Sequence, residues 1–196
     1  MIPEKDVMQY WKDRAKQQGE ATVGFAGHDL EQQDRDYYEK KKFIFQYVPV
    51  MLPTLDYGCG IGRYSDVFQD GYLGVDITPE LLDYARKLNP TRDYKQLEHP
   101  WLHGIEFEFS LFFTATVLQH NDDETVKKIF ASLSAYKKED FFIALYENSQ
   151  AKAPHVKGRS SDEYVQLVKT QFDVKFVWSY KHKTHGEEHT LTMIDL

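Results

Sequence analysis

The sequence has almost no cysteine and no long apolar run. The single cysteine, Cys59, excludes an internal disulfide and fits a reducing compartment, so we expect a cytoplasmic protein. No apolar stretch approaches the roughly 20 residues that cross a membrane. Residues 1–6 are charged and lack the apolar segment of a secretory signal, so we expect neither a membrane span nor a cleaved leader.

The chain also lacks the basic excess of a nucleic-acid-binding protein. It carries 24 Lys and Arg against 31 Asp and Glu, which gives a net charge of −7. This balance argues against nucleic acid as a partner, although residues 40–42 and 181–183 are local basic segments. A length of 196 residues, with 41% apolar and 15% aromatic content, fits one domain with a substantial core.

What the sequence does contain is a glycine motif that follows an apolar, strand-like run. Asp56 ends the run, and Gly58, Gly60 and Gly62 follow at alternate positions. Glycine is needed where the backbone turns sharply or approaches a ligand closely. A strand, a glycine turn and a helix N-terminus in that order indicate a nucleotide or cofactor cradle. The carboxylate of Asp56 suits a cationic group, such as the ammonium of an amino-acid tail.

Two other glycine cradles fit less well. A phosphate-binding P-loop needs Lys followed by Ser or Thr, and no such pair follows Gly62. A dinucleotide fold needs Gly-x-Gly-x-x-Gly, but the residue three positions after Gly60 is Arg63. A second acidic residue, Asp76, ends the next apolar run, where its carboxylate can accept both hydroxyls of a ribose. The alternative is a coincidental glycine turn in an ordinary α/β domain.

The segment from Asp56 to Gly62, followed by Asp76, resembles the acidic-x-Gly-x-Gly-x-Gly signature of the class I S-adenosylmethionine-dependent methyltransferases. Within that family the chain is most similar to the small-molecule enzymes. The resemblance covers about residues 54–196. It implies S-adenosylmethionine as cofactor, with S-adenosylhomocysteine as product. It also implies a single methyltransferase domain over residues 1–196, with an N-terminal helical cap at 1–48 and a cofactor-binding core at 49–196.

The rest of the chain alternates strand and helix signals. Pro49 and Pro53 break the chain after the first two helices, and Thr78 before a proline marks a later helix start. Ser160 with Glu163 offers a capping box. We expect helices at about 4–18, 29–47, 62–70, 78–89, 122–136 and 161–170, strands at about 54–57, 72–75, 93–97, 109–117 and 141–146, and a final hairpin of 174–180 with 189–194.

This alternation predicts an α/β fold with a mostly parallel sheet and helices on both faces. The resemblance implies a Rossmann-like, seven-stranded twisted sheet that ends in a C-terminal antiparallel hairpin. The link at residues 99–104 is short and irregular, so we expect the helix between the third and fourth strands to be reduced or missing. We therefore expect an open pocket, which residues 1–48 or the partner subunit of a homodimer would close.

Ligands of open α/β sheets bind beyond the carboxyl ends of the strands, and this rule selects the candidate cofactor residues. Ile77 is placed to touch the adenine face. The resemblance places a polar contact to the adenine amine after the third strand, where this sequence departs from the family's acidic-then-apolar pair. The set is Asp56, Gly58, Cys59, Gly60, Gly62, Asp76, Ile77, Gln96, Leu97 and Leu118, with Tyr10, Trp11 and Arg14 from the first helix.

The N-terminal residues of this set have two interpretations. Either Tyr10 and Trp11 close over the cofactor and Arg14 holds its carboxylate, or the aromatic side chains pack in the core. The same choice applies to Tyr37 and Tyr38, which line a substrate pocket or pack internally. The segment 149–159 also has two interpretations. Either it lies over the mouth of the predicted active site, as a lid or acceptor-recognition element suited to an anionic substrate, or it is a solvated basic loop. Its basic residues are Lys152, His155, Lys157 and Arg159.

Methyl transfer from a sulfonium is an in-line displacement, so a protein contributes mainly positioning and desolvation. A base is needed where the acceptor must lose a proton. His120, at the end of the fourth strand, is the first candidate because its ordinary pKa lies near neutrality. The alternative is a residue that packs against the cofactor. Glu147 and Tyr146, expected at the end of the fifth strand and just beyond it, are the second candidates.

Metal chemistry is not expected. His182, His185 and His189 lie in and beside a polar turn, but no cysteine accompanies them. Cys59 is a spacer between glycines, which favours a packing role over that of a nucleophile.

The class of methyl acceptor is inferred by excluding other classes. Enzymes that methylate exocyclic amines of bases share an Asn/Asp-Pro-Pro-aromatic motif after the fourth strand, where this chain reads Leu-Gln-His-Asn. Carbon-5 methylation of pyrimidines needs a cysteine nucleophile, and the single cysteine lies in the glycine motif. The strand end resembles the Val-Leu-His-His of small-molecule O- or N-methyltransferases. We therefore expect a small-molecule acceptor. A protein or RNA acceptor and a non-catalytic cofactor-binding module are the alternatives.

Overall fold

The structure is a computed structural model that describes residues 4–18, 30–69, 71–150, 156–184 and 187–196. No helix among these residues is long and apolar enough to cross a membrane. The helices are α1 (Glu4–Gln18), α2 (Leu30–Tyr47), α3 (Pro79–Leu88), α4 (Asp123–Ser132) and α5 (Ser161–Lys169), with 3-10 turns η2 (Leu118–His120) and η3 (Leu133–Ala135). The strands are β1 (Thr54–Tyr57), β2 (Tyr72–Asp76), β3 (Asp93–Gln96), β4 (Leu111–Ala115), β5 (Phe142–Asn148), β6 (Phe176–Thr184) and β7 (Glu187–Asp195).

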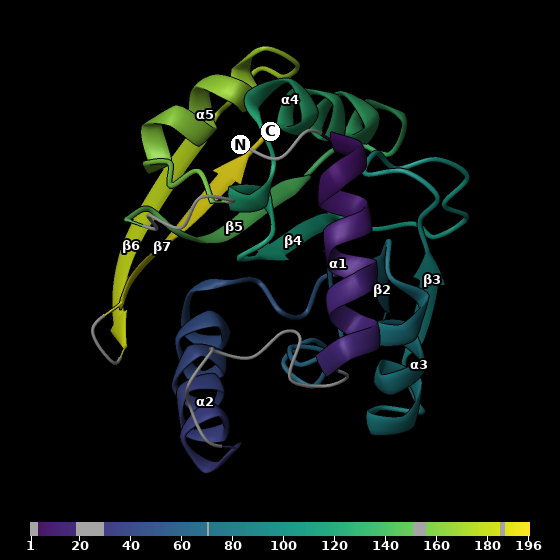
Figure 1. Ribbon diagram of the computed structural model, residues 1–196. Helices are drawn as coiled ribbons and strands as arrows, with labels where there is room; N and C mark the ends of the chain where they lie inside the picture. The colour runs from purple at the N-terminus through teal and green to yellow at the C-terminus, as the bar shows by residue number, and fades with distance from the viewer. Residues whose placement is uncertain (1–3, 19–29, 70, 151–155, 185–186) are drawn as a thin grey trace.

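The strands form one seven-stranded sheet in the order β3-β2-β1-β4-β5-β7-β6 (Figure 1). The pairs among β1 to β5 are parallel, and β7 pairs antiparallel with both β5 and β6. The predicted mostly parallel sheet with a C-terminal antiparallel hairpin is therefore confirmed. The strand order reverses between β1 and β4, and at such a switch point the carboxyl ends of the strands open a crevice.

Side chains alternate between the two faces of the sheet, and each face has its own apolar core. On β4, Phe112 packs on the side of α4 and α5, whereas Phe113 packs on the side of α2. Leu145 and Tyr146 of β5 divide in the same way. Figure 1 shows α4 and α5 above the sheet and α2 below it. Because both faces are covered, β4 reads as a continuous apolar run.

The prediction of a helix at residues 62–70 is wrong. Residues 60–67 instead form successive turns, joined by hydrogen bonds that span three residues, such as that from the Ser65 N–H to the Gly62 carbonyl at 3.1 Å. Gly62 has φ +72°, which lies outside the helical region. The β-branched and aromatic residues that follow it are also poor helix formers.

Strand β5 is longer than predicted. It reaches Asn148, so Glu147 lies inside the strand and not beyond it as predicted, whereas Tyr146 lies within the predicted bounds of 141–146. The antiparallel pairing with β7 extends the strand, since Asn148 lies opposite His189. Other local predictions are confirmed. Residues 97–110, all within the described part of the chain, contain no helix, and the capping box of Ser160 is present at the start of α5.

The end of β4 is strained and packs against the glycine motif. Thr116 has φ +58°, a region that β-branched residues rarely occupy, and its N–H donates to the Tyr146 carbonyl at 2.8 Å. The next residue, Val117, meets Gly58 so closely that a Cβ on Gly58 would lie 2.5 Å from Val117 Cγ2. Because Gly58 also has φ +71°, both its backbone and its packing require glycine.

This contact gives the first testable prediction. Gly58→Ala should lower the free energy of unfolding by about 2–4 kcal/mol, because it combines left-handed backbone strain with overpacking. Gly104→Ala is the matched control, since Gly104 has φ +63° with nothing within 4 Å of an added Cβ. It should cost only about 1–2 kcal/mol. In a Val117→Ala background the cost of Gly58→Ala should fall to that of the control, as measured by urea denaturation. An unchanged cost in that background would contradict the prediction.

Candidate functional site

The glycine motif follows β1 at the carboxyl edge of the sheet, and its three glycines have different contacts. Their φ angles are +71°, +55° and +72° in chain order. A Cβ on Gly58 would meet Val117, and one on Gly62 would lie 2.4 Å from the Tyr94 hydroxyl. The N–H of Gly60 donates to Oδ2 of Asp76 at 2.9 Å. The outer two glycines therefore allow packing within the protein, whereas the central one joins the motif to the tip of the next strand.

Asp76 ends β2, and both of its carboxylate oxygens accept backbone N–H groups. Oδ2 accepts from Gly60, and Oδ1 accepts from Thr78 at 2.8 Å. Burial raises the pKa of Asp76, and the N–H donors of Thr78 and Gly60 oppose that shift. Each carboxylate oxygen has a second lone pair, so the group can accept further hydroxyl donors. The residues present therefore fit a ribose at this strand tip.

Asp56 lies on the α2 side of β1, beneath the glycine motif. Its Oδ2 accepts a hydrogen bond from the Tyr72 hydroxyl at 2.7 Å. Burial raises the pKa of Asp56 to about 7, the Tyr72 hydroxyl opposes the rise, and the charge of Asp76 adds to it. Cys59 packs on Gly74, where an added Cβ would lie 2.9 Å from Sγ. Burial raises the pKa of the Cys59 thiol, which keeps the sulfur protonated.

Four further residues of the predicted cofactor-binding set lie in three different environments. Gln96 is exposed at the end of β3, and Ile77 is half-buried against the core that α4 and α5 cover. Leu97 is buried in that core, and its N–H donates to the Asp76 carbonyl at 2.8 Å. Leu118 is fully buried in the same core. Of the four, Gln96 and Ile77 are thus the most accessible to a ligand beyond the strand tips.

Helix α1 packs across the glycine motif. Ala15 is buried with Ile61 of the motif and Leu81 of α3 in one apolar cluster. Figure 1 shows α1 standing beside β2 and α3. This packing places the C-terminal part of α1 against the turn that follows β1.

The same helix reaches the turn after β4. The ring of Trp11 meets the imidazole of His120 edge-on, with centroids 5.0 Å apart. Tyr10 packs edge-on against Trp11, and Arg14 donates to the Tyr10 hydroxyl at 2.8 Å. The structure therefore brings Trp11, Arg14 and His120 together, although Trp11 and His120 are more than 100 positions apart in the sequence.

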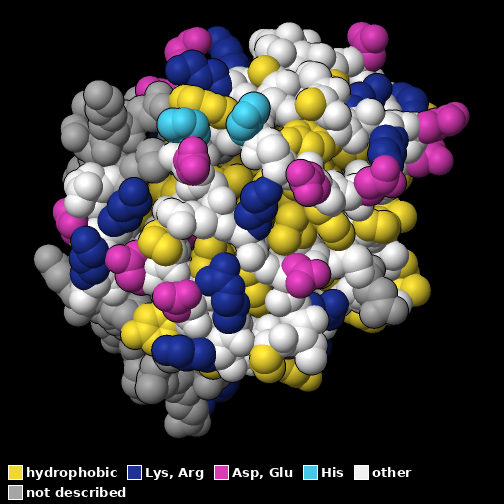
Figure 2. All heavy atoms as spheres, turned by 90° about the vertical axis from the view of Figure 1, so that its right-hand side faces the viewer, with side chains coloured by type: hydrophobic (Ala, Val, Ile, Leu, Met, Phe, Trp, Pro, Cys, Tyr) yellow, Lys and Arg dark blue, Asp and Glu magenta, His cyan; other side chains and the backbone are white. Residues whose placement is uncertain are grey.

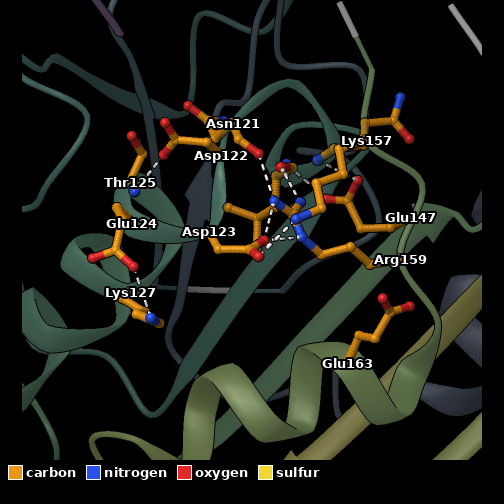
Figure 3. A network of polar contacts seen from close by, with 12 residues as sticks. Asn121, Asp122, Asp123, Glu124, Thr125, Lys127, Glu147, Lys157, Arg159 and Glu163 are labelled. Atoms are coloured by element: carbon orange, nitrogen blue, oxygen red, sulfur yellow. Dashed lines mark hydrogen bonds and ion pairs between the residues drawn. The ribbon is translucent and has the colours of Figure 1, made fainter. Parts of the chain in front are cut away.

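Glu147 points at the turn that carries His120. Its carboxylate accepts the N–H groups of Val117, Leu118 and Gln119 at 3.1, 3.0 and 3.3 Å. Burial raises the pKa of Glu147 to about 7, while the three N–H donors and the charge of Arg159 oppose the rise. Figure 3 shows this carboxylate among the polar contacts around the turn.

Tyr146 belongs to a different environment. Consecutive residues of a strand point to opposite faces, and Tyr146 is fully buried on the α2 side. Its hydroxyl lies 2.7 Å from Nδ1 of His182, and its ring stacks on His189. Burial and the charge of Lys40 lower the pKa of both histidines, so they are neutral at pH 7. No group of metal-ligating residues occurs in the described part of the chain. His185 lies outside it.

The residues predicted to line a substrate pocket or lid also differ from one another. Tyr38 is exposed, whereas the ring of Tyr37 carries the Arg63 guanidinium at 4.1 Å. Lys152 and His155 lie outside the described residues.

Lys157 and Arg159 both bind Asp123 at the start of α4, at 2.6 and 2.8 Å (Figure 3). Their hydrogen bonds and charges hold the pKa of Asp123 below its ordinary value. Arg159 is buried rather than directed at solvent. Sequence reasoning missed this role because 36 residues separate Arg159 from Asp123.

No protein-family model matches the chain, and no curated protein matches it in sequence. Solved structures do match. Magnesium protoporphyrin IX methyltransferase (ChlM) from Synechocystis, with bound SAH, has a TM-score of 0.71 and 12% identity over 97% of this chain and 98% of that chain. A TehB-like SAM-dependent methyltransferase from Corynebacterium glutamicum has a TM-score of 0.61 and 19% identity over 97% and 96%. Phosphoethanolamine N-methyltransferase 1 of Haemonchus contortus has a TM-score of 0.73 and 17% identity over 97% of this chain and 48% of that one. The structural neighbours are thus SAM-dependent small-molecule methyltransferases, and the chain has the class I methyltransferase fold.

Proposed function

We propose that the protein is an S-adenosylmethionine-dependent methyltransferase that methylates an O or N atom of a small molecule. The observation that carries this proposal is the hydrogen bond between the Gly60 N–H and the Asp76 carboxylate. It joins the glycine motif to Asp76, the two features of the sequence that indicate cofactor binding, at the carboxyl edge of the sheet. The fold of the structural neighbours, several of which hold SAM or SAH, supports the same function.

In this proposal the cofactor lies across the tips of β1 and β2. Asp76 accepts the ribose hydroxyls through its remaining lone pairs. Ile77 and Gln96 flank the adenine. Asp56, when ionised, attracts the ammonium of the methionine portion from beneath the glycine motif. Arg14 of α1 pairs with the carboxylate of that portion, and Trp11 covers the site.

S-adenosylmethionine, when bound, supplies a methyl group on a sulfonium that needs no further activation. The protein therefore has to exclude water and fix the acceptor in line with the departing sulfur. His120, in the η2 turn and beside Trp11, is the group we assign to accept a proton from the acceptor's O–H or N–H. Glu147 is less suited to that role, since both of its oxygens already accept N–H groups of the turn.

A small acceptor is supported by the printed names of the structural neighbours, which act on magnesium protoporphyrin IX, phosphoethanolamine and geranyl diphosphate. The surface charge agrees with it. On the face shown in Figure 2, basic and acidic side chains are interspersed and form no continuous basic patch. A phosphate backbone is usually bound by such a patch. A protein or RNA acceptor and a non-catalytic cofactor-binding module are the alternatives that the experiments below separate.

The first experiment is a calorimetric titration of the protein with S-adenosylmethionine and with S-adenosylhomocysteine. We expect a sub-millimolar Kd. Asp76→Ala and Asp76→Asn should weaken binding by about tenfold or more, because a charged hydrogen bond contributes roughly 1.5–3 kcal/mol. Asp93→Asn, at an exposed position where β3 begins, is the control and should bind as the wild type does. Absence of wild-type binding at millimolar cofactor would overturn the proposed function.

The pKa of Asp56 predicts a pH dependence of that binding. With a pKa of about 7 the carboxyl is largely protonated at lower pH, and a bound ammonium favours its ionised form. Binding should therefore release a proton and become tighter by on the order of tenfold as the pH rises from about 6 to about 8. Titrations in buffers of different ionisation enthalpy measure the proton release. If Asp56→Asn keeps the full pH dependence, another group is responsible.

Turnover separates the acceptor classes. The protein is incubated with S-adenosylmethionine and a panel of phenols, carboxylic acids and primary amines, and S-adenosylhomocysteine formation is measured. A small-molecule enzyme should change in rate less than about twofold from about 50 to about 200 mM salt, because no polyanion is bound. A steep fall with salt, seen only with RNA or protein as acceptor, would favour the macromolecular alternative. Cofactor binding without turnover on any acceptor would favour the non-catalytic module.

A further inference from the structure

The His120-bearing turn η2 is a single turn of 3-10 helix. So short a helix has little stability of its own, and its end N–H and C=O groups lack partners within the helix. The turn nevertheless has to hold His120 against Trp11 on α1, where the two rings meet at 5.0 Å. Something outside the turn must therefore fix it.

Two buried side chains hold the turn at its two ends. At the N-terminal end, the Glu147 carboxylate accepts three consecutive N–H groups, from Val117 to Gln119. At the C-terminal end, Arg159 donates from Nη1 to the Leu118 carbonyl at 3.0 Å and from Nη2 to the Asn121 carbonyl at 2.6 Å. The remaining Nε–H of Arg159 donates to Asp123 at 2.9 Å, which orients the guanidinium (Figure 3).

The charges match the dipole of the turn. A carboxylate stabilises the N-terminal end of a helix, and a cation stabilises the C-terminal end. Glu147 and Arg159 are each only 2% exposed. Burying a charge costs several kcal/mol unless hydrogen bonds satisfy it. Here the backbone of residues 117–121 supplies most of those hydrogen bonds, so the two charges and the turn depend on each other.

We propose that Glu147 and Arg159 are positioning residues that clamp the η2 turn from both ends and so fix the imidazole of His120 toward Trp11. This inference rests on the proposed function for its catalytic meaning. Neither residue touches the reacting atoms. Both act through His120.

The test compares three clamp variants with a control. Arg159→Gln removes the charge, Arg159→Lys keeps the charge but loses the planar fork, and Asp123→Asn removes the carboxylate that orients Arg159. Glu124→Gln is the control. It changes the neighbouring acid of α4, which is exposed and pairs with Lys127 at 2.8 Å. Asp123 is 42% exposed, so Asp123→Asn should fold even if Arg159→Gln does not.

Amide hydrogen exchange and histidine NMR are the primary readouts. We expect exchange at Leu118 and Gln119 to rise at least tenfold in Arg159→Gln and less in Arg159→Lys. The imidazole signals of His120, assigned with His120→Asn, should shift as the contact with Trp11 is lost. Glu124→Gln should match the wild type in both readouts. Unchanged exchange and unchanged His120 signals in the folded clamp variants would overturn the proposal.

Turnover provides the second readout, with the panel acceptor that gives the highest wild-type rate. Loss of positioning should lower kcat by about tenfold or more with a smaller change in the KM for S-adenosylmethionine. A normal kcat in variants with a displaced His120 would show that the clamp has no role in catalysis. If the wild type binds no cofactor, the proposed function fails, and the exchange and NMR data still decide whether the clamp exists.

Discussion

The hydrogen bond from the Gly60 N–H to the Asp76 carboxylate is the interaction on which the candidate site depends. It ties the turn after β1 to the tip of β2 at the carboxyl edge of the sheet. The adjacent glycines make this possible by letting Val117 and Tyr94 approach the backbone. The arrangement also places two buried carboxyls, Asp56 and Asp76, close enough for the charge of one to raise the pKa of the other. A cationic ligand would relieve that repulsion.

A second set of contacts builds the turn that carries the proposed base, His120. The strained Thr116 ends β4, and the clamp of Glu147 and Arg159 holds the following turn. Helix α1 contacts both the glycine motif and the η2 turn, since Ala15 packs on the motif while Trp11 packs against His120. The proposed base therefore depends on three segments that are distant in sequence. A change in any of them would move His120 relative to the glycine motif.

The sequence predicted most of the fold because its signals are local. Alternating strand and helix patterns, Thr78 before a proline, and the capping box of Ser160 each act within a few residues. The helix expected at 62–70 failed because Gly62 adopts a left-handed φ to pack on Tyr94, a tertiary contact without a local signature. Glu147 was expected beyond β5, but pairing with β7 extends that strand. The inward direction of Arg159 likewise depends on Asp123, 36 residues away.

The central claim is that Asp76 and the glycine motif form the cofactor cradle and that His120 faces it. An experimental structure of the protein with S-adenosylhomocysteine tests this most directly. We predict ribose hydroxyls on the Asp76 carboxylate, the amino-acid portion over Gly60, and the sulfur on the side where His120 lies. S-adenosylhomocysteine bound elsewhere, or bound without contact to Asp76, would show that Asp76 and the glycine motif do not form the cofactor site.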